Sequence, residues 1–410
     1  MLENDRRGWI IVGVLFATMF LIWGPVNAGG VFFLPVITHF KWSRGLFSAL
    51  VATAPLAAGV SSPIVGSMLD RVSPRKVMVA GAAMVALAYF ALSRANSASA
   101  FLAIFIVLGI GITASTIIPS AVVITSLFRE QRGLALGIAF AAIPLGGTGI
   151  TILANRVVLR YGFRAGYLAM ALPIALLVIP LLVVFLPAGP VTEAADGDRS
   201  RVDAALAPGL EVREALRSRS FWMIAIAEVL FATAGVGIRV HLIPYLTGIG
   251  YTPTMAAQIF GAMFLFSAAG SFLAGPLADR LGARWMLAVV FLAGAIGIAS
   301  LLGAAHIASL GLFVLVFGLV RETFLLPLMI GESLGAKNLG ALLGMQAFFT
   351  TLGFAAGPII AGRIFDVSGS YSAALMLFAG MALISSLAIR ATLPLAEERA
   401  RFAIEDPATA

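Results

Sequence analysis

The chain has 410 residues, of which 60% are apolar and only 11% are charged, and its mean hydropathy is +1.03. A soluble globular protein carries about 25% charged residues, so this composition excludes the soluble class and indicates a membrane protein. The chain has no cysteine, which excludes disulfides, thiolate catalysis and cysteine-bound metal. The net charge of +8 comes without a dense basic run, so we predict no nucleic-acid partner.

Long apolar blocks separated by short polar breaks follow one another along the whole chain. A helix that crosses the bilayer needs about 20 apolar residues, and most of the blocks reach that length. The first block is too long for the core of a cleaved signal peptide, so we expect an uncleaved first helix. The pattern predicts twelve transmembrane helices, at about 8–37, 45–69, 76–94, 98–127, 133–158, 164–187, 220–247, 255–279, 284–305, 307–334, 340–365 and 371–394.

One polar stretch divides these helices into two sets of six. It opens with Pro and Gly, continues with acidic residues and ends in a short amphipathic segment, as linkers between bundles do. The predicted organisation is an N-terminal six-helix bundle, a cytoplasmic linker, a C-terminal six-helix bundle and a cytoplasmic tail. Their bounds are 1–187, 188–219, 220–394 and 395–410.

The distribution of basic residues predicts how the helices are oriented. If the N-terminus lies inside, 18 of the 27 Lys and Arg residues fall on the cytoplasmic side, seven fall on the other side and two lie within helices. Cytoplasmic loops carry the excess of positive charge, so we expect both termini in the cytoplasm of a multi-pass protein of the cytoplasmic (inner) membrane.

A short charged motif occurs twice, once in each predicted bundle. GSMLDRVSPRK follows the second helix and GPLADRLGAR follows the eighth, with matching residues 209 positions apart. Two copies at equivalent places predict two halves related by a pseudo-twofold axis normal to the membrane, an architecture of transporters. The matching residues are Gly66 and Gly275, Asp70 and Asp279, Arg71 and Arg280, and Arg75 and Arg284.

These loops resemble the signature loop of the major facilitator superfamily. FREQRGLALG (128–137), YGFRAGY (161–167) and GPIIAGRIFDVSGSY (357–371) are also similar to segments of that superfamily. The resemblance implies an all-α fold of two six-helix bundles and transport by alternating access. It also implies that the eight matching loop residues gate the two halves. From its position at the end of the second helix, Asp70 can accept bonds from Arg71, Arg75 or the N-terminus of a neighbouring helix. The alternative for the arginines is that their positive charge only anchors the topology.

Within the superfamily, the stretches 30–48 and 221–246 are most similar to monocarboxylate and oxalate/formate porters and their bacterial relatives. This similarity implies a small organic anion as substrate, carried with a proton. Monocarboxylate members carry a cationic residue in the first helix and an Asp–Arg pair within the eighth helix. Neither feature has a counterpart here, since the first helix has no charge after Gly8 and the eighth has none before Asp279.

Four charged residues lie deep within predicted helices, where an isolated charge costs about 2.5–3.5 kcal/mol on insertion scales. We predict that Arg321 binds a substrate carboxylate, because guanidinium offers a planar two-point match. Glu228 or Glu322 is the predicted proton-coupling group, and Arg239 is a further candidate for the cavity. The alternative from the same residues is an ion pair between Glu228 and Arg321 that touches no substrate.

The resemblance also implies that the first, fourth, seventh and tenth helices line the cavity. Trp23 and Asn27 end an aromatic stripe on the first helix, and Thr113, Thr116 and Ser120 share one face of the fourth. Packing against neighbours and hydrogen bonds back to the same helix are the ordinary alternatives for these side chains. The full substrate-binding set is Arg321, Asn27, Trp23, Thr113, Thr116, Arg239, Gln346 and Phe349.

No sequence motif supports catalysis or a cofactor. The three histidines are scattered, and neither an H-E-x-x-H nor a nucleotide-binding motif occurs, so we predict no enzyme, no metal and no cofactor. The predicted partners are a small anionic substrate, protons and the lipid bilayer, and the expected state is a monomer. Two alternatives stay open: proton-coupled efflux of hydrophobic drugs, and a non-transporting membrane receptor or enzyme.

Overall fold

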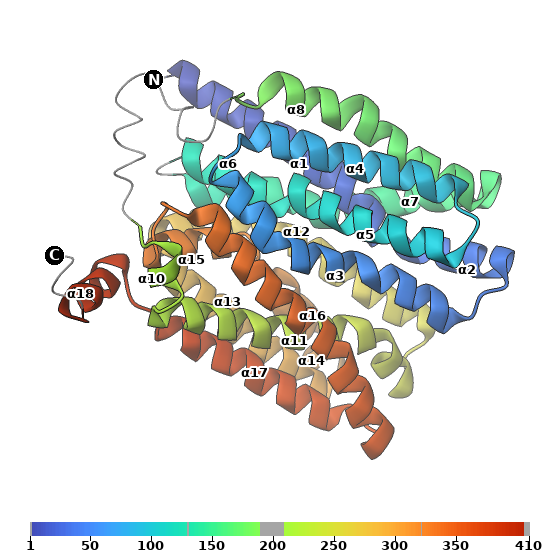
Figure 1. The fold of residues 1–410 in the computed structure, drawn as a ribbon. Helices are drawn as coiled ribbons and strands as arrows, with labels where there is room; N and C mark the ends of the chain where they lie inside the picture. The colour runs from blue at the N-terminus through green and yellow to red at the C-terminus, as the bar shows by residue number, and fades with distance from the viewer. Residues whose placement is uncertain (1, 129–130, 189–208, 321, 406–410) are drawn as a thin grey trace. The chain divides into compact units, whose positions relative to one another are not determined.

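The computed structural model describes residues 2–128, 131–188, 209–320 and 322–405 of the chain (Figure 1). The described residues are almost entirely helical, as predicted. Internal contacts divide the chain into two compact units. Unit 1 comprises Met1–Leu206 with Leu343–Met345, and unit 2 comprises Ala207–Leu342 with Gln346–Ala410.

Unit 1 contains the six helices predicted for the first half of the chain, several of them divided into segments. The segments are α1 (Leu2–Asn27), α2 (Gly29–Phe40), α3 (Arg44–Leu69), α4 (Pro74–Arg94), α5 (Ala98–Ser115), α6 (Ile117–Leu127), α7 (Arg132–Pro173), the π-helix η1 (Ile174–Val178) and α8 (Ile179–Phe185). Gly162 divides α7, because its φ of 81° is left-handed and allows the chain to turn between two membrane-spanning helices.

Unit 2 repeats this plan, with short helices added near the linker and at the C-terminus. Its elements are α10 (Val212–Ala215), α11 (Arg219–Gly248), α12 (Pro253–Leu281), α13 (Ala283–Ser300), the 3₁₀ turn η3 (Leu301–Gly303), α14 (Ile307–Leu319), α15 (Leu325–Ser333), α16 (Leu339–Ser368), α17 (Ser372–Arg390) and α18 (Leu395–Glu405). Within the described ranges, ten helical spans are long and apolar enough to cross a membrane, and one of them, Arg132–Phe185, contains two predicted helices.

Three of the predicted helices are interrupted near their middle, which the apolar pattern did not show. The first breaks at Ala28. The fourth breaks at Thr116, whose φ of −124° and ψ of −104° are not helical. The tenth leaves helical geometry at Val320 and resumes at Leu325. Pro119 and Pro327 stand just after the last two breaks, and a proline cannot donate to the carbonyl four residues before it. A break inside the bilayer requires protein or water around the freed backbone groups.

The 209-residue repeat extends from the charged loops into the packing between helices. In unit 1, a Cβ at Gly109 on α5 would clash with the carbonyl of Ala54 on α3. The equivalent Gly318 on α14 lies against Met263 on α12, where an added Cβ would come 3.3 Å from the carbonyl oxygen. The absence of a side chain thus lets two backbones approach closely at the same place in both units.

Candidate functional site

Among the charged residues singled out in the sequence that the structure describes, Glu228 is the most deeply buried. It lies on the continuous helix α11 with 4% of its surface exposed. Its Oε1 atom has no hydrogen-bond partner among the described residues. A buried carboxylate without a partner is costly when ionised, and such a group lowers that cost by taking up a proton. This geometry suits a proton-binding residue.

Close packing fixes the segment of α11 that carries Glu228. Gly353 on α16 lies against Val229, the next residue, and an added Cβ would come within 2.5 Å of its carbonyl oxygen. One turn further along, Gly357 lies against the carbonyl of Thr233. Two glycines one turn apart on α16 therefore hold the helix that carries Glu228 at backbone-contact distance.

Glu322 lies in the break of the tenth predicted helix, between α14 and α15. Its side chain is half-buried, and its carboxylate interacts electrostatically with that of Glu228. Two carboxyl groups that interact in this way repel each other when both are ionised. Arg321, the predicted ligand of the substrate carboxylate, lies outside the described residues.

The other candidates of unit 2 lie on α11 and α16. Arg239 is half-buried, and its guanidinium folds back over Gly235 on the preceding turn. Gln346 is fully buried and donates from Nε2 to the carbonyl of Phe221 at 3.1 Å, while its Oε1 has no partner among the described residues. Phe349 packs against Trp222 with ring centroids 5.6 Å apart. Gln346 and Phe349 therefore lie toward the beginning of α11, two turns from Glu228.

The candidates on the first predicted helix lie at its break. Trp23 is half-buried and its indole N–H has no hydrogen-bond partner in the described part of the chain. Asn27, the last residue of α1, is exposed and donates from Nδ2 to the carbonyl of Ile143 on α7 at 3.4 Å. Both groups are hydrogen-bond donors, and the indole nitrogen of Trp23 is buried whereas Asn27 is exposed.

The candidates on the fourth predicted helix form hydrogen bonds to backbone carbonyls instead. Thr113 donates to the carbonyl of Ala58 on α3 at 3.1 Å, and Thr116 donates to Ile112 on its own helix at 2.7 Å. Ser120 is fully buried without a described partner. Because the helix breaks at Thr116, the helical spacing that placed these three residues on one face does not continue across it.

The four deep charges occur in only one of the two sequence repeats. At 209 positions earlier, Glu228 corresponds to Met19, Arg239 to Gly30, Arg321 to Ile112 and Glu322 to Thr113. The packing is similar in the two units, since Gly146 lies against Phe20 in unit 1 and Gly353 lies against Val229 in unit 2, although these two glycines are 207 rather than 209 positions apart. The four charges thus have uncharged counterparts, which concentrates charge-dependent chemistry in unit 2.

The duplicated charged loops each connect two helices of one unit. Gly66 lies near the end of α3, Asp70 is its C-terminal cap, Arg71 begins the loop, and Arg75 lies in the first turn of α4. Gly275, Asp279 and Arg280 lie in the last turns of α12, and Arg284 is the second residue of α13, where its guanidinium donates to the carbonyl of Arg390.

Glu332 on α15 is a residue of this loop region that the sequence interpretation missed. Its carboxylate accepts from the backbone N–H groups of Ala283 at 2.7 Å and Arg284 at 3.2 Å. A carboxylate at a helix N-terminus satisfies free N–H groups and complements the helix dipole. The signal in the sequence is an acidic residue near the end of the predicted helix 307–334.

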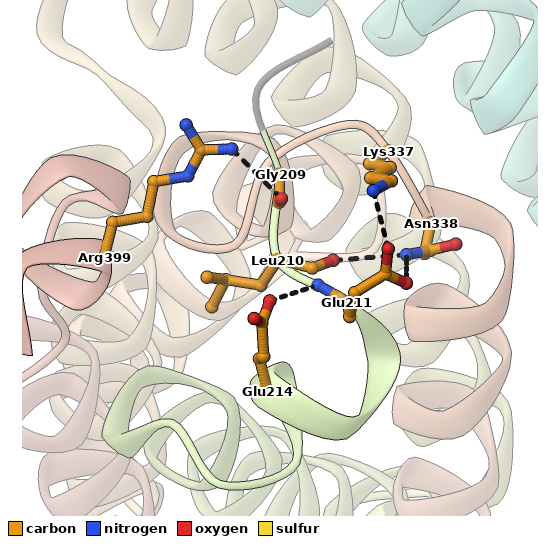
Figure 2. A network of polar contacts seen from close by, with 7 residues as sticks. All are labelled: Gly209, Leu210, Glu211, Glu214, Lys337, Asn338 and Arg399. Carbon is orange, nitrogen blue, oxygen red and sulfur yellow. Dashed lines mark hydrogen bonds and ion pairs between the residues drawn. The ribbon is translucent and has the colours of Figure 1, made fainter. Parts of the chain in front are cut away.

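A network of polar contacts near the start of α11 joins the linker to the loop after α15 (Figure 2). The backbone N–H of Leu210 donates to the carbonyl of Leu334 at 2.9 Å, and Asn338 returns a bond to the carbonyl of Leu210 at 3.2 Å. Lys337 pairs with Glu211 at 2.6 Å. Arg399 on α18 donates to the carbonyl of Gly209 at 3.1 Å. We call this set the linker cluster.

The ion pair of the linker cluster predicts a local response to acid. Lys337 lowers the pKa of Glu211 below its ordinary value of 4.5, first through the hydrogen bond and then through its charge. A lowered pKa means that the pair stabilises the fold above the unfolded pKa and ceases to do so as the pH falls through the folded pKa. Lys337→Ala should therefore speed amide exchange at Leu210 near neutral pH but not at pH 3. Both side chains are exposed, so overall stability should change little.

The described side chains form no cluster of metal ligands. They contain no group of three or more His, Asp or Glu residues arranged to hold a metal ion. The candidate site instead combines three features of the duplicated helical fold. These are membrane helices with breaks, buried polar atoms without described partners, and the two interacting acids Glu228 and Glu322. Discontinuous helices at such depth are typical of the binding sites of secondary transporters.

Comparisons with known proteins place the chain in one family. The model of the Major Facilitator Superfamily matches residues 11–327 and 242–408. A Bacillus subtilis protein described as the uncharacterized MFS-type transporter YcxA is 27% identical over 94% of this chain and 96% of its own. Monocarboxylate transporter 13 of Rattus norvegicus is 24% identical over 94% of this chain and 89% of its own.

Solved structures show the same fold. The human organic anion transporter MFSD10 superposes with a TM-score of 0.72 at 18% identity, over 93% of this chain and 99% of the other. Fold, helix breaks and relatives together define a membrane transporter and not an enzyme, as expected from the sequence. The chain belongs to the Major Facilitator Superfamily.

Proposed function

We propose that this transporter carries a small organic anion resembling a monocarboxylate, together with a proton, by alternating access. The observation that supports this proposal best is the buried carboxyl group of Glu228, whose Oε1 has no hydrogen-bond partner among the described residues and which interacts with Glu322 in a helix break. Arg321 is adjacent to Glu322 in sequence and supplies the positive charge that an anion needs. The name of the rat relative, a monocarboxylate transporter, points to the same substrate class.

Each residue has a proposed role. Arg321 binds the substrate carboxylate, Glu228 takes the proton and Glu322 is its acidic partner. Trp23 and Asn27 offer hydrogen-bond donors from unit 1. Arg239, Thr113, Thr116, Gln346 and Phe349 complete the proposed substrate set, and the duplicated loops act as gates. We further propose a monomer in the cytoplasmic membrane with both termini in the cytoplasm, as the distribution of basic residues favours.

Arg321→Ala should abolish uptake of radiolabelled lactate, used as the test monocarboxylate, into proteoliposomes with an inward proton gradient. Arg321→Lys should retain only part of it, because lysine keeps the charge but loses the two-point match. The matched control is Arg217→Ala, an exposed arginine near the linker. Uptake that survives Arg321→Ala would contradict the anion site, and export of a hydrophobic dye without lactate uptake would favour the drug-efflux alternative.

A further inference from the structure

The C-terminal helix α18 contacts unit 2 through one buried acid. Glu398 is 1% exposed, and its Oε1 accepts from the backbone N–H of Ser220 at 2.9 Å and from the hydroxyl of Ser220 at 2.5 Å. Ser220 is the second residue of α11, where backbone N–H groups lack partners within the helix. The last helix of the chain thus supplies a cap to the helix that carries Glu228.

The residue after this acid reaches a second segment. Arg399 donates to the carbonyl of Gly209 in the linker cluster (Figure 2). The adjoining Leu210 and Glu211 bond to Leu334, Lys337 and Asn338, which connect α15 to α16. Two neighbouring side chains of α18 therefore link the start of α11 to the end of α15.

The position of α15 makes this link mechanically important. α15 is a nine-residue helix, and its connection to α14 runs through the non-helical break that contains Glu322. A short helix behind a break can pivot unless its far end is held. Two contacts hold the C-terminal end of α15. Glu332 accepts from the backbone N–H of Ala283 at the start of α13, and the carbonyl of Leu334 accepts from Leu210 of the linker cluster.

We propose that α18 is a latch that fixes the α15 half of the broken tenth helix relative to α11, and so sets the exposure of the break. Loss of the latch frees α15 and opens the segment around Glu322. This role extends beyond the proposed anion and proton transport, because α18 contains no residue of the predicted substrate set and its role does not depend on which substrate is carried.

The absence of cysteine provides a direct test, since a single introduced thiol is the only one in the chain. Thr323→Cys places it in the break, at a half-buried position. The rate of labelling by N-ethylmaleimide is measured on the full-length protein in nanodiscs, and amide exchange of 209–216 and 332–340 is followed alongside. When Glu398→Gln is added to the Thr323→Cys protein, the labelling rate and both exchange rates should rise about tenfold, as expected when a hydrogen-bond acceptor loses its charge.

Matched controls lie on the same helix. Glu397 and Arg401 are exposed, and Glu397→Gln and Arg401→Gln should leave labelling and exchange unchanged. Arg399→Gln keeps the cap on α11 and loses the bond to Gly209, so it should raise exchange at 209–216 and 332–340 without exposing the start of α11. The proposal is overturned if Glu398→Gln and Arg399→Gln variants, folded by thermal unfolding and elution profile, label and exchange at the rates of the parent protein.

Discussion

Glu228→Gln is expected to abolish proton-driven accumulation of the substrate while leaving substrate exchange intact. With one proton per monocarboxylate, an inward gradient of one pH unit can support about tenfold accumulation, since 1.4 kcal/mol corresponds to a factor of ten. Glutamine keeps the size and a polar head but cannot take up a proton. The variant should equilibrate lactate across the vesicle membrane and accumulate none, as measured by the radiolabel ratio with and without the gradient.

The control for this variant is Glu332→Gln, which changes an acid of unit 2 that accepts from the start of α13 and lies outside the proposed proton site. It should reduce stability and still accumulate lactate under the gradient. If Glu228→Gln accumulates lactate as the parent protein does, the proton does not bind at Glu228. If neither exchange nor accumulation survives in a folded variant, Glu228 is required for the carrier cycle itself and the assignment as coupling residue alone is wrong.

Gly357→Ala is expected to produce a large loss of stability from the addition of one methyl group. The new Cβ would clash with the carbonyl of Thr233 and come 2.8 Å from the backbone nitrogen of Gly237. Both atoms belong to α11, and a helix backbone cannot move aside as the end of a side chain can. Overpacking of this kind costs about 1–3 kcal/mol. The apparent Tm of the purified protein in detergent should fall, and transport should fall with it because α11 carries Glu228.

The same substitution at Gly380 provides the opposite expectation. Gly380 lies on α17, and a Cβ there would meet no heavy atom within 4 Å. Alanine favours helix over glycine by about 1 kcal/mol, so Gly380→Ala should leave the Tm equal or raise it. A Tm for Gly357→Ala equal to that of the Gly380 variant would show that α11 and α16 do not pack as closely as described.

Much of the fold follows from patterns that lie along the chain. Apolar blocks long enough to span a bilayer predicted the helices, and the spacing between Asp70 and Asp279 predicted two equivalent halves. The same spacing recurs in the packing of Gly109 and Gly318, which no local pattern marks as a contact. The break at Thr116 was missed because the apolar pattern continues across it, and the break at Glu322 was missed because Arg321 and Glu322 were interpreted as charges within one continuous helix. Pro119 and Pro327 are the signals that could have located them.

For the candidate site too, the sequence predicts some features and only the tertiary structure shows the others. An ionisable residue inside an apolar block is visible in the sequence, and Glu228 and Glu322 were identified on that ground. The sequence does not show that Oε1 of Glu228 lacks a hydrogen-bond partner among the described residues, or that the hydroxyl groups of Thr113 and Thr116 donate to backbone carbonyls. Partners of a polar group come from other helices, whose identity a one-dimensional pattern does not contain.

The sequence alone determined that this protein resides in a membrane, that its two halves repeat and that its deep charges are few, because hydropathy, spacing and charge are properties of residues in order. Only the tertiary structure decided which of these residues meet. It placed Glu322 in a helix break within electrostatic reach of Glu228, brought Glu332 to the start of α13 and brought Glu398 to the start of α11. Glu398 and Ser220 are 178 positions apart, and such contacts depend on how helices pack rather than on local propensity.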